Sequence, residues 1–230
     1  MGTATGWSQY KVERKFIYPK AFSAGKPYSP GVLAGKTLYI SGQVDKDPKT
    51  GAQPKGIAEQ TRMAMANLGH VLRAAGMDYG NVVSCHVQLA DMGQYKEMNE
   101  VYGSYFGPEH FPARTTLEFP GLPGGANVEI SCIAYADKSK IALVVPPAGS
   151  IPPAMGPYRP GVWAGETLYV STCFGEMWPT FAPSRKTLTT PPSPMAGLLR
   201  WARRGPSRDA ALSTTRVGNA PQIRFGARHS

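Results

Sequence analysis

The sequence predicts an α+β domain in which two helices pack on one face of a sheet. Apolar residues recur at three- and four-residue spacing in two stretches, residues 57–75 and 95–105, as in amphipathic helices. Four shorter stretches read as strands because polar and apolar residues alternate in them or apolar residues dominate: residues 37–43, 81–89, 113–119 and 127–135. We expect the last two strands to form an antiparallel pair after the second helix.

The ends of these elements carry matching signals. Gly76 follows the first helix, and the Asp91–Gln94 spacing of a capping box opens the second. The strand at 81–89 places Val83, Cys85, Val87 and Leu89 on one face, and its other face carries the more polar residues. The helices cover one face of the sheet, so the other face must be solvated or covered by another subunit.

Three widely separated cysteines, Cys85, Cys132 and Cys173, argue against a disulfide framework or a zinc site. Cys85 and Cys132 lie within apolar strand patterns, so we expect buried thiols there. No sequence pattern indicates a metal or an organic cofactor. The chain has no apolar run long enough to cross a membrane and no signal-peptide core near its first residue, which predicts a cytoplasmic protein.

A repeat divides the chain. Residues 27–41, PYSPGVLAGKTLYIS, recur at 157–171 as PYRPGVWAGETLYVS, with eleven of fifteen positions identical at an offset of 130. Nothing after Glu176 matches the residues after Gln43. The sequence therefore predicts a complete domain over residues 1–140 and the truncated start of a second one over 141–176, which either pairs with the first domain or remains free.

The last segment, residues 177–230, differs in composition from the rest. It holds nine basic residues and one acidic residue, which leaves a net charge of only +2 on the first 176 residues out of +10 overall. It is rich in Pro, Ser, Thr and Arg, so we expect a disordered basic tail or translation out of frame. The nearly neutral body argues against nucleic-acid binding.

One residue stands out chemically. Arg114 lies inside a strand, PARTTLEF, on the same predicted face as Thr116 and Glu118. A guanidinium flanked by hydroxyl side chains could bind a carboxylate through two parallel hydrogen bonds. The alternative is an internal ion pair with Glu118 or Glu129, and the residue spacing alone leaves both open. The common phosphate-binding, dinucleotide-binding and hydrolase motifs do not occur.

Several longer stretches together carry a family resemblance. AGKPYSPGVLAGKTLYISGQ, GIAEQTRMAMANLGHVLRAAG, DMGQYKEMNEVYGSYF, FPARTTLEF and NVEISCIA occur in an order and spacing that resemble the Rid (YjgF) family of reactive-intermediate imine deaminases. The resemblance covers residues 12–137. It implies a chorismate-mutase-like fold with a mixed sheet, and a homotrimer with ligand sites at its subunit interfaces.

The resemblance also implies an activity and a set of site residues. The archetypal reaction hydrolyses imines of small 2-amino acids to 2-keto acids and ammonia without a cofactor. Arg114 takes the place of the arginine that holds the substrate carboxylate, and Ser131 replaces a glutamate that positions water. The other matching positions are Tyr28, Ser41, Gly42, Asn99 and Thr116, where Thr116 replaces a cysteine.

These residues predict a deaminase acting on small imino or enamine carboxylates. A serine is a poor base at neutral pH. The alternative is therefore a non-catalytic member of the same family, which binds small imino or keto carboxylates or has a regulatory role. A ribonuclease or translation inhibitor is the third option, and the charge distribution disfavours it.

Overall fold

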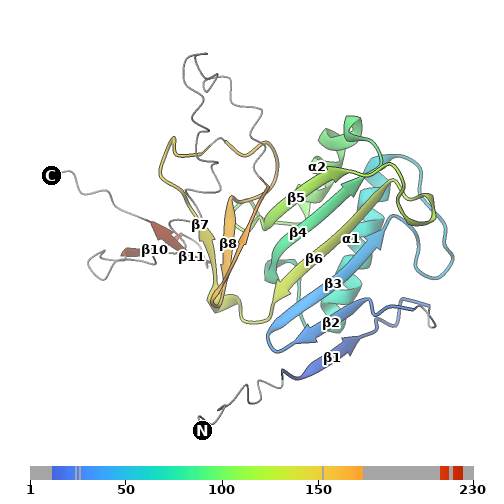
Figure 1. Cartoon of the computed structure of the whole chain (residues 1–230), viewed down its shortest axis with the longest axis horizontal. Coiled ribbons are helices and arrows are strands. Elements are labelled where there is room, and N and C mark those ends of the chain that lie inside the picture. Colours follow the sequence, from blue (N-terminus) through green and yellow to red (C-terminus); the bar gives the residue numbers. More distant parts are fainter. Residues whose placement is uncertain are drawn as a thin grey trace, which may run out of the picture.

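The computed structural model describes residues 12–23, 25, 27–151 and 153–172, together with the backbone of two strands near the C-terminus. The first part of this chain contains six strands and two helices: β1 (Arg14–Ile17), β2 (Gly31–Ala34), β3 (Thr37–Val44), α1 (Ile57–Ala74), β4 (Val82–Leu89), α2 (Tyr95–Ser104), β5 (Ala113–Glu118) and β6 (Val128–Tyr135). Both helices lie on the same side of the six-stranded sheet (Figure 1). The predicted α+β class and the two-helix layer are confirmed.

The helices begin and end close to the expected residues. Gly76, with a φ of 74°, follows α1 in the left-handed region that glycine adopts without strain. The Asp91 carboxylate accepts a hydrogen bond from the Gly93 N–H at 2.8 Å, but this opens a short 3₁₀ turn, Met92–Gln94, and α2 starts only at Tyr95. The Asp91 cap is therefore present one turn before the α-helix proper, but the reciprocal bond of the expected capping box is not, because Gln94 Oε1 has no hydrogen-bond partner.

The pairing of the last two strands differs from our expectation. The sheet order is β1-β2-β3-β6-β4-β5, so β6 lies between β3 and β4, and β5 is an edge strand that runs parallel to β4. The prediction of an antiparallel β5–β6 pair is therefore wrong. The chain crosses from β4 to β5 through α2, and a helical crossover delivers the next strand parallel to the first.

One main core lies between the sheet and the helices. Leu68, Val71 and Leu72 of α1 are fully buried there against residues of the sheet such as Val87 and Ile130. Val83 is the exception to the predicted strand faces, because the β4–β6 register shifts between Val82 and Ser84. This irregularity turns Val83 away from the helices into a second, smaller core.

Cys85 and Cys132 do not remain separate thiols. They lie directly opposite each other on β4 and β6, with Cα atoms 4.1 Å apart, and their sulfur atoms form a disulfide bond. The expectation of two buried free thiols is therefore wrong. The two residues were correctly placed on the buried face, but their pairing depends on the β4–β6 register, which the sequence pattern did not contain.

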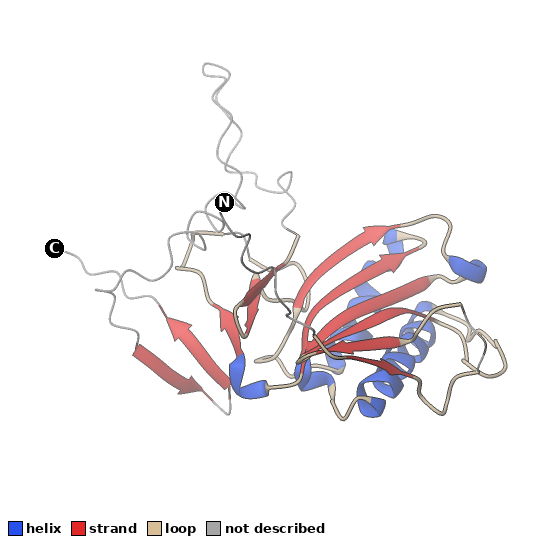
Figure 2. Cartoon of the chain, turned by 60° about the horizontal axis from the view of Figure 1, so that its bottom comes forward, coloured by secondary structure: helices blue, strands red, loops and turns tan. Residues whose placement is uncertain are grey.

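A second sheet comes later in the chain. It contains β7 (Ile141–Val144), β8 (Gly161–Ala164) and β9 (Thr167–Val170), and β10 (Ser213–Val217) and β11 (Ala220–Arg224) extend it in the order β10-β11-β7-β8-β9. Figure 2 shows it beside the six-stranded sheet. Its small core packs Leu143, Val162 and Ala164 against Val83 and Ala113 of the first sheet.

The repeated sequence has a repeated backbone pairing. β2 pairs with β3 from Gly31↔Ile40 to Ala34↔Thr37, and β8 pairs with β9 in the same register shifted by 130, from Gly161↔Val170 to Ala164↔Thr167. The domain boundaries at residues 140 and 176 remain a prediction. Of the predicted tail, residues 177–230, only the backbones of β10 and β11 are described, and its other residues lie outside the described part.

Candidate functional site

Arg114 is the centre of a buried polar cluster at the sheet edge. Its side chain is only 3 % exposed, and it points from β5 toward α2. Its Nη1 donates to Asn99 Oδ1 at 2.7 Å, and its Nη2 donates to the Tyr95 hydroxyl at 3.0 Å. The guanidinium carbon lies 5.6, 4.9 and 5.4 Å from the ring centroids of Tyr95, Tyr102 and Tyr158. These distances are those of cation–π contacts.

No carboxylate neutralises this buried cation within the described residues, where none of the ion pairs involves Arg114. Glu118, one predicted partner, instead accepts a hydrogen bond from the backbone N–H of Met92 at 2.8 Å. The Tyr102 hydroxyl and Thr116 Oγ1 are both buried without a hydrogen-bond partner. A buried guanidinium without a carboxylate partner, together with two hydroxyls that lack hydrogen-bond partners, is unfavourable for the stability of the fold. The same groups can bind an anionic ligand.

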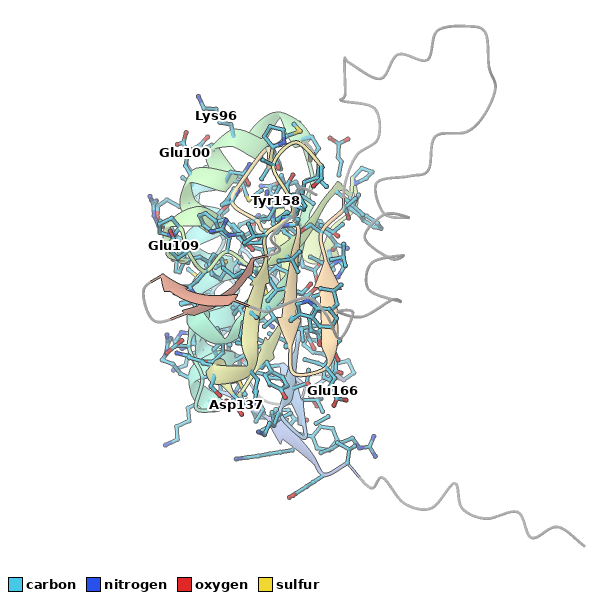
Figure 3. All side chains as sticks on the ribbon, turned by 90° about the vertical axis from the view of Figure 1, so that its left-hand side faces the viewer. Lys96, Glu100, Glu109, Asp137, Tyr158 and Glu166 are labelled. Carbon is cyan, nitrogen blue, oxygen red and sulfur yellow. A yellow bond between two sulfur atoms is a disulfide. The ribbon has the colours of Figure 1, made fainter. Side chains whose placement is uncertain are left out.

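Part of this cluster comes from the second half of the chain. The Arg114 backbone N–H donates to Ser171 Oγ at 2.8 Å, and the Thr172 N–H donates to the Arg114 carbonyl at 3.2 Å. The hydroxyls of Thr115 and Thr172 are 2.6 Å apart. Gly156 packs so closely that a Cβ there would lie 2.7 Å from Arg114 Nη2. Tyr158 in Figure 3 belongs to this segment, which covers the free edge of β5.

The other predicted site residues form a separate pocket. Tyr28, Ser41 and Gly42 line it together with Glu129 from β6. The Glu129 carboxylate lies directly over Gly42, where a Cβ would come within 1.7 Å of Oε1, so any side chain at Gly42 would force the Glu129 side chain to move. Partial burial raises the pKa of Glu129 above the 4.5 of an exposed glutamate.

The sheet separates the two groups. On β6, Ile130 and Cys132 face the helices, so Glu129 and Ser131 project from the opposite face. Arg114 points to the helix side. We call Arg114, Asn99, Thr116, Tyr95 and Tyr102 the arginine cluster, and we call Tyr28, Ser41, Gly42 and Glu129 the glutamate pocket. Within one chain the predicted catalytic pair, Arg114 and Ser131, does not come together.

Sequence reasoning missed several of these residues. The apolar spacing of residues 95–105 predicted only an amphipathic helix, and Tyr102 is buried in the core as that pattern implies, but Tyr95 and Tyr102 also contact Arg114. Glu129 was considered only as an ion-pair partner. Tyr158 and Ser171 carried a usable signal, because they match Tyr28 and Ser41 in the repeat.

Comparisons with known proteins fit this architecture. A family profile described as Endoribonuclease L-PSP matches residues 18–136, which is half of the chain. The chain is 46 % identical to the 2-iminobutanoate/2-iminopropanoate deaminase of Bos taurus over 116 residues, which cover 50 % of this chain and 84 % of that protein. It belongs to the Rid (YjgF) family.

Further members of the family agree with this placement. The human 2-iminobutanoate/2-iminopropanoate deaminase is 41 % identical over 124 residues, covering 54 % of this chain and 90 % of the human protein. The crystal structure of the YjgF gene product of E. coli aligns with a TM-score of 0.50 at 34 % identity, covering 54 % of this chain and 99 % of that one. A Rid-family protein of Yersinia pestis, YyfA, aligns with a TM-score of 0.51 at 35 % identity, covering 54 % and 99 %.

The part of the chain that the structure describes holds neither a candidate membrane span nor a cluster of metal ligands. None of its helices is long and apolar enough to cross a membrane. It contains no group of three or more His, Cys, Asp or Glu side chains gathered as metal ligands.

Proposed function

We propose that this protein hydrolyses small 2-imino or enamine carboxylates. The imine carbon takes up water and the carbon–nitrogen bond breaks, so that R–C(=NH)–COO⁻ and H₂O give R–CO–COO⁻ and NH₃. The reaction is redox-neutral, and its atoms balance without a cofactor. Two relatives named 2-iminobutanoate/2-iminopropanoate deaminase, at 46 % and 41 % identity over nearly their whole length, support this proposal.

The observation that carries the proposal is the unneutralised guanidinium of Arg114. A buried cation without a carboxylate partner among the described residues favours an anionic ligand, and the planar fork matches a carboxylate. Asn99 and Tyr95 hold two of the guanidinium donors, which fixes the orientation of the group before substrate arrives. Such positioning supplies a large part of the rate in a reaction between a bound substrate and a held water.

The glutamate pocket would supply the water. A carboxylate whose pKa is raised by burial is a stronger base than an exposed one, which suits Glu129 for taking a proton from the attacking water. Ser131, on the same face of β6, would orient that water by hydrogen bonding. Since the sheet separates this pocket from Arg114, a complete site needs the arginine cluster of one chain and the glutamate pocket of another. We propose that the domain of residues 1–140 forms this assembly, as the homotrimer implied by the family resemblance.

The test measures imine hydrolysis directly. 2-Iminobutanoate is generated in situ, semicarbazide competes for it, and 2-ketobutyrate formation is measured with and without protein. We expect acceleration by the domain of residues 1–140, which carries both the arginine cluster and the glutamate pocket, and a loss of about 100-fold in kcat/KM for Arg114→Ala in that domain. Arg114→Lys keeps the charge but not the fork, so it should recover only part of the loss, while circular dichroism checks that both variants fold. An Arg114→Ala variant as fast as the wild type rejects the proposal.

A second candidate is carboxylate binding without turnover. The separation of Arg114 from Glu129 and Ser131 within one chain favours it, because binding needs only the arginine cluster. Calorimetry with 2-ketobutyrate separates the two candidates. Binding that is lost in Arg114→Ala, measured on residues 1–140 that show no hydrolytic activity, supports the second.

We do not propose an endoribonuclease activity for this chain, although the matching family profile carries that description. Phosphate-backbone binding needs clustered Lys and Arg, and residues 1–176 carry a net charge of only +2. The cytoplasmic location expected from the sequence stays a prediction.

A further inference from the structure

We propose that residues 153–172 occupy, within the same chain, the surface around Arg114 that residues 27–42 of a second copy would otherwise bind. We call residues 27–42 the first repeat and residues 157–172 the second repeat. On this proposal the second repeat takes the place of a neighbouring subunit and prevents the chain from closing into an oligomer.

The two repeats have the same local structure in different surroundings. Ser41 Oγ donates to the Ser29 carbonyl at 2.6 Å, and Ser171 Oγ donates to the Arg159 carbonyl at 2.5 Å. The Ser41 and Ser171 N–H groups donate to the carbonyls of Pro30 and Pro160, each at 3.0 Å. The hairpin turns at Gly35 and Gly165 have φ values of 58° and 59°. A segment with one intrinsic shape can therefore bind the same surface from either position in the sequence.

The contacts of the second repeat are ones that the first repeat could also make. Ser171 Oγ and the Thr172 N–H satisfy the Arg114 backbone on the free edge of β5. The tyrosine ring of the second repeat, Tyr158, stacks on the Arg114 guanidinium. Ser41, the Gly42 N–H and Tyr28 are the matching groups of the first repeat. Tyr28 is 48 % exposed in this chain, and no described guanidinium stacks on its ring as Arg114 does on Tyr158.

This arrangement makes the interface between copies head-to-tail. Each chain has an arginine cluster at the β5 edge and a first repeat near the other edge of the same sheet, where it forms β2 and most of β3. Binding of the first repeat of one copy to the arginine cluster of the next is a heterologous contact, and such contacts build rings when the rotation closes. A second repeat already bound at β5 leaves no place for the next copy, so the ring cannot form.

Binding of the second repeat in place of a neighbouring copy affects the hydrolytic reaction as well as the oligomeric state. The second repeat supplies counterparts of Tyr28 and Ser41, but no described strand follows β9 as a counterpart of β6, so nothing in the described part stands for Glu129 or Ser131 beside Arg114. Resting on the proposed function, the intact chain is then a carboxylate-binding form with little hydrolytic activity. Release of the second repeat would expose the surface that completes the site.

The experiment compares the intact chain, residues 1–230, with residues 1–140. The shorter piece holds the whole main core, and relatives that match it over 84–99 % of their length consist of little else, so it folds alone. We expect light scattering to give a monomer for the intact chain and an assembly of about three copies for residues 1–140. In the intact chain, Gly156→Val should displace the second repeat and shift the protein to the assembly, because its side chain would press against Arg114, Tyr95 and Asn99 at once.

Ala154→Val is the matched control, since Ala154 is exposed two residues away, and it should leave a monomer. An intact chain that forms the same assembly as residues 1–140, or a truncated piece that stays monomeric, overturns the proposal. Imine hydrolysis measured on both proteins keeps the two proposals apart. Assembly of residues 1–140 without activity rejects the deaminase and leaves the docking intact, whereas activity in an intact trimer rejects the docking alone.

Discussion

The first and second repeats share eleven of their first fifteen residues and the same internal hydrogen bonds, yet they meet different neighbours. The first repeat lies under the Glu129 carboxylate and leaves Tyr28 half exposed. The second lies on the β5 edge and stacks Tyr158 on Arg114. The last residue of each repeat, Gly42 in one and Thr172 in the other, differs because of these neighbours. A carboxylate excludes a side chain at Gly42, and the Thr115 hydroxyl bonds to one at Thr172.

This contrast predicts its largest effect at Gly42. Gly42→Thr in residues 1–140 should lower the free energy of unfolding by about 1–3 kcal/mol, because the new side chain and Glu129 compete for one space. Urea denaturation measures the loss. Adding Glu129→Ala should recover most of it, which a double-mutant cycle reports as a coupling energy. Equal losses with and without Glu129 would mean that the carboxylate is not the cause.

A smaller, local effect is expected at Ser171. Ser171→Ala in the intact chain removes the acceptor of the Arg114 N–H, so hydrogen exchange of that amide should become about 10-fold faster. Ser41→Ala is the matched control, because the hydroxyl that it removes bonds only to the Ser29 carbonyl of the first repeat among the contacts described. An Arg114 amide that exchanges at the wild-type rate in Ser171→Ala shows that the second repeat does not protect β5.

The smallest effect is a pH dependence at Glu129. Burial raises the pKa of this carboxyl in the folded protein, so the folded state binds more protons than the unfolded state just above pH 4.5. Stability contributed by this group is therefore present below that pH and is lost as the pH rises through the raised folded pKa. Glu129→Gln should flatten this part of the stability curve, measured by urea denaturation at several pH values. An unchanged slope contradicts the assignment.

The sequence predicted the individual helices and strands but not the order of the strands in the sheet. The spacing of apolar residues placed α1, α2, β3, β4, β5 and β6 within one or two residues of their ends. It could not give the insertion of β6 between β3 and β4, which depends on the crossover through α2. The Cys85–Cys132 disulfide and the turning of Val83 depend in the same way on the register of that central pair.

For the candidate site, the sequence predicted several of the residues but not where they lie relative to one another. Arg114 was singled out by its position in a strand, and Tyr28, Ser41, Gly42, Asn99 and Thr116 by the family resemblance. Their distribution over two faces of the sheet needs the three-dimensional order of the strands, and no spacing rule contains it. The role of Glu129 was hidden because it depends on the absence of a side chain at Gly42, far earlier in the chain.

A covalent link can test whether the second repeat binds Arg114 of its own chain. The hydroxyls of Thr115 and Thr172 are 2.6 Å apart, so cysteines at both positions can reach each other. Thr115→Cys with Thr172→Cys is made in a Cys173→Ser background, and intact mass and non-reducing electrophoresis are recorded after oxidation. If the second repeat binds Arg114 of its own chain, oxidation should give a monomer that has lost two hydrogens to a new internal disulfide. Covalent dimers or larger species joined through these cysteines, or two thiols that stay free, would contradict it.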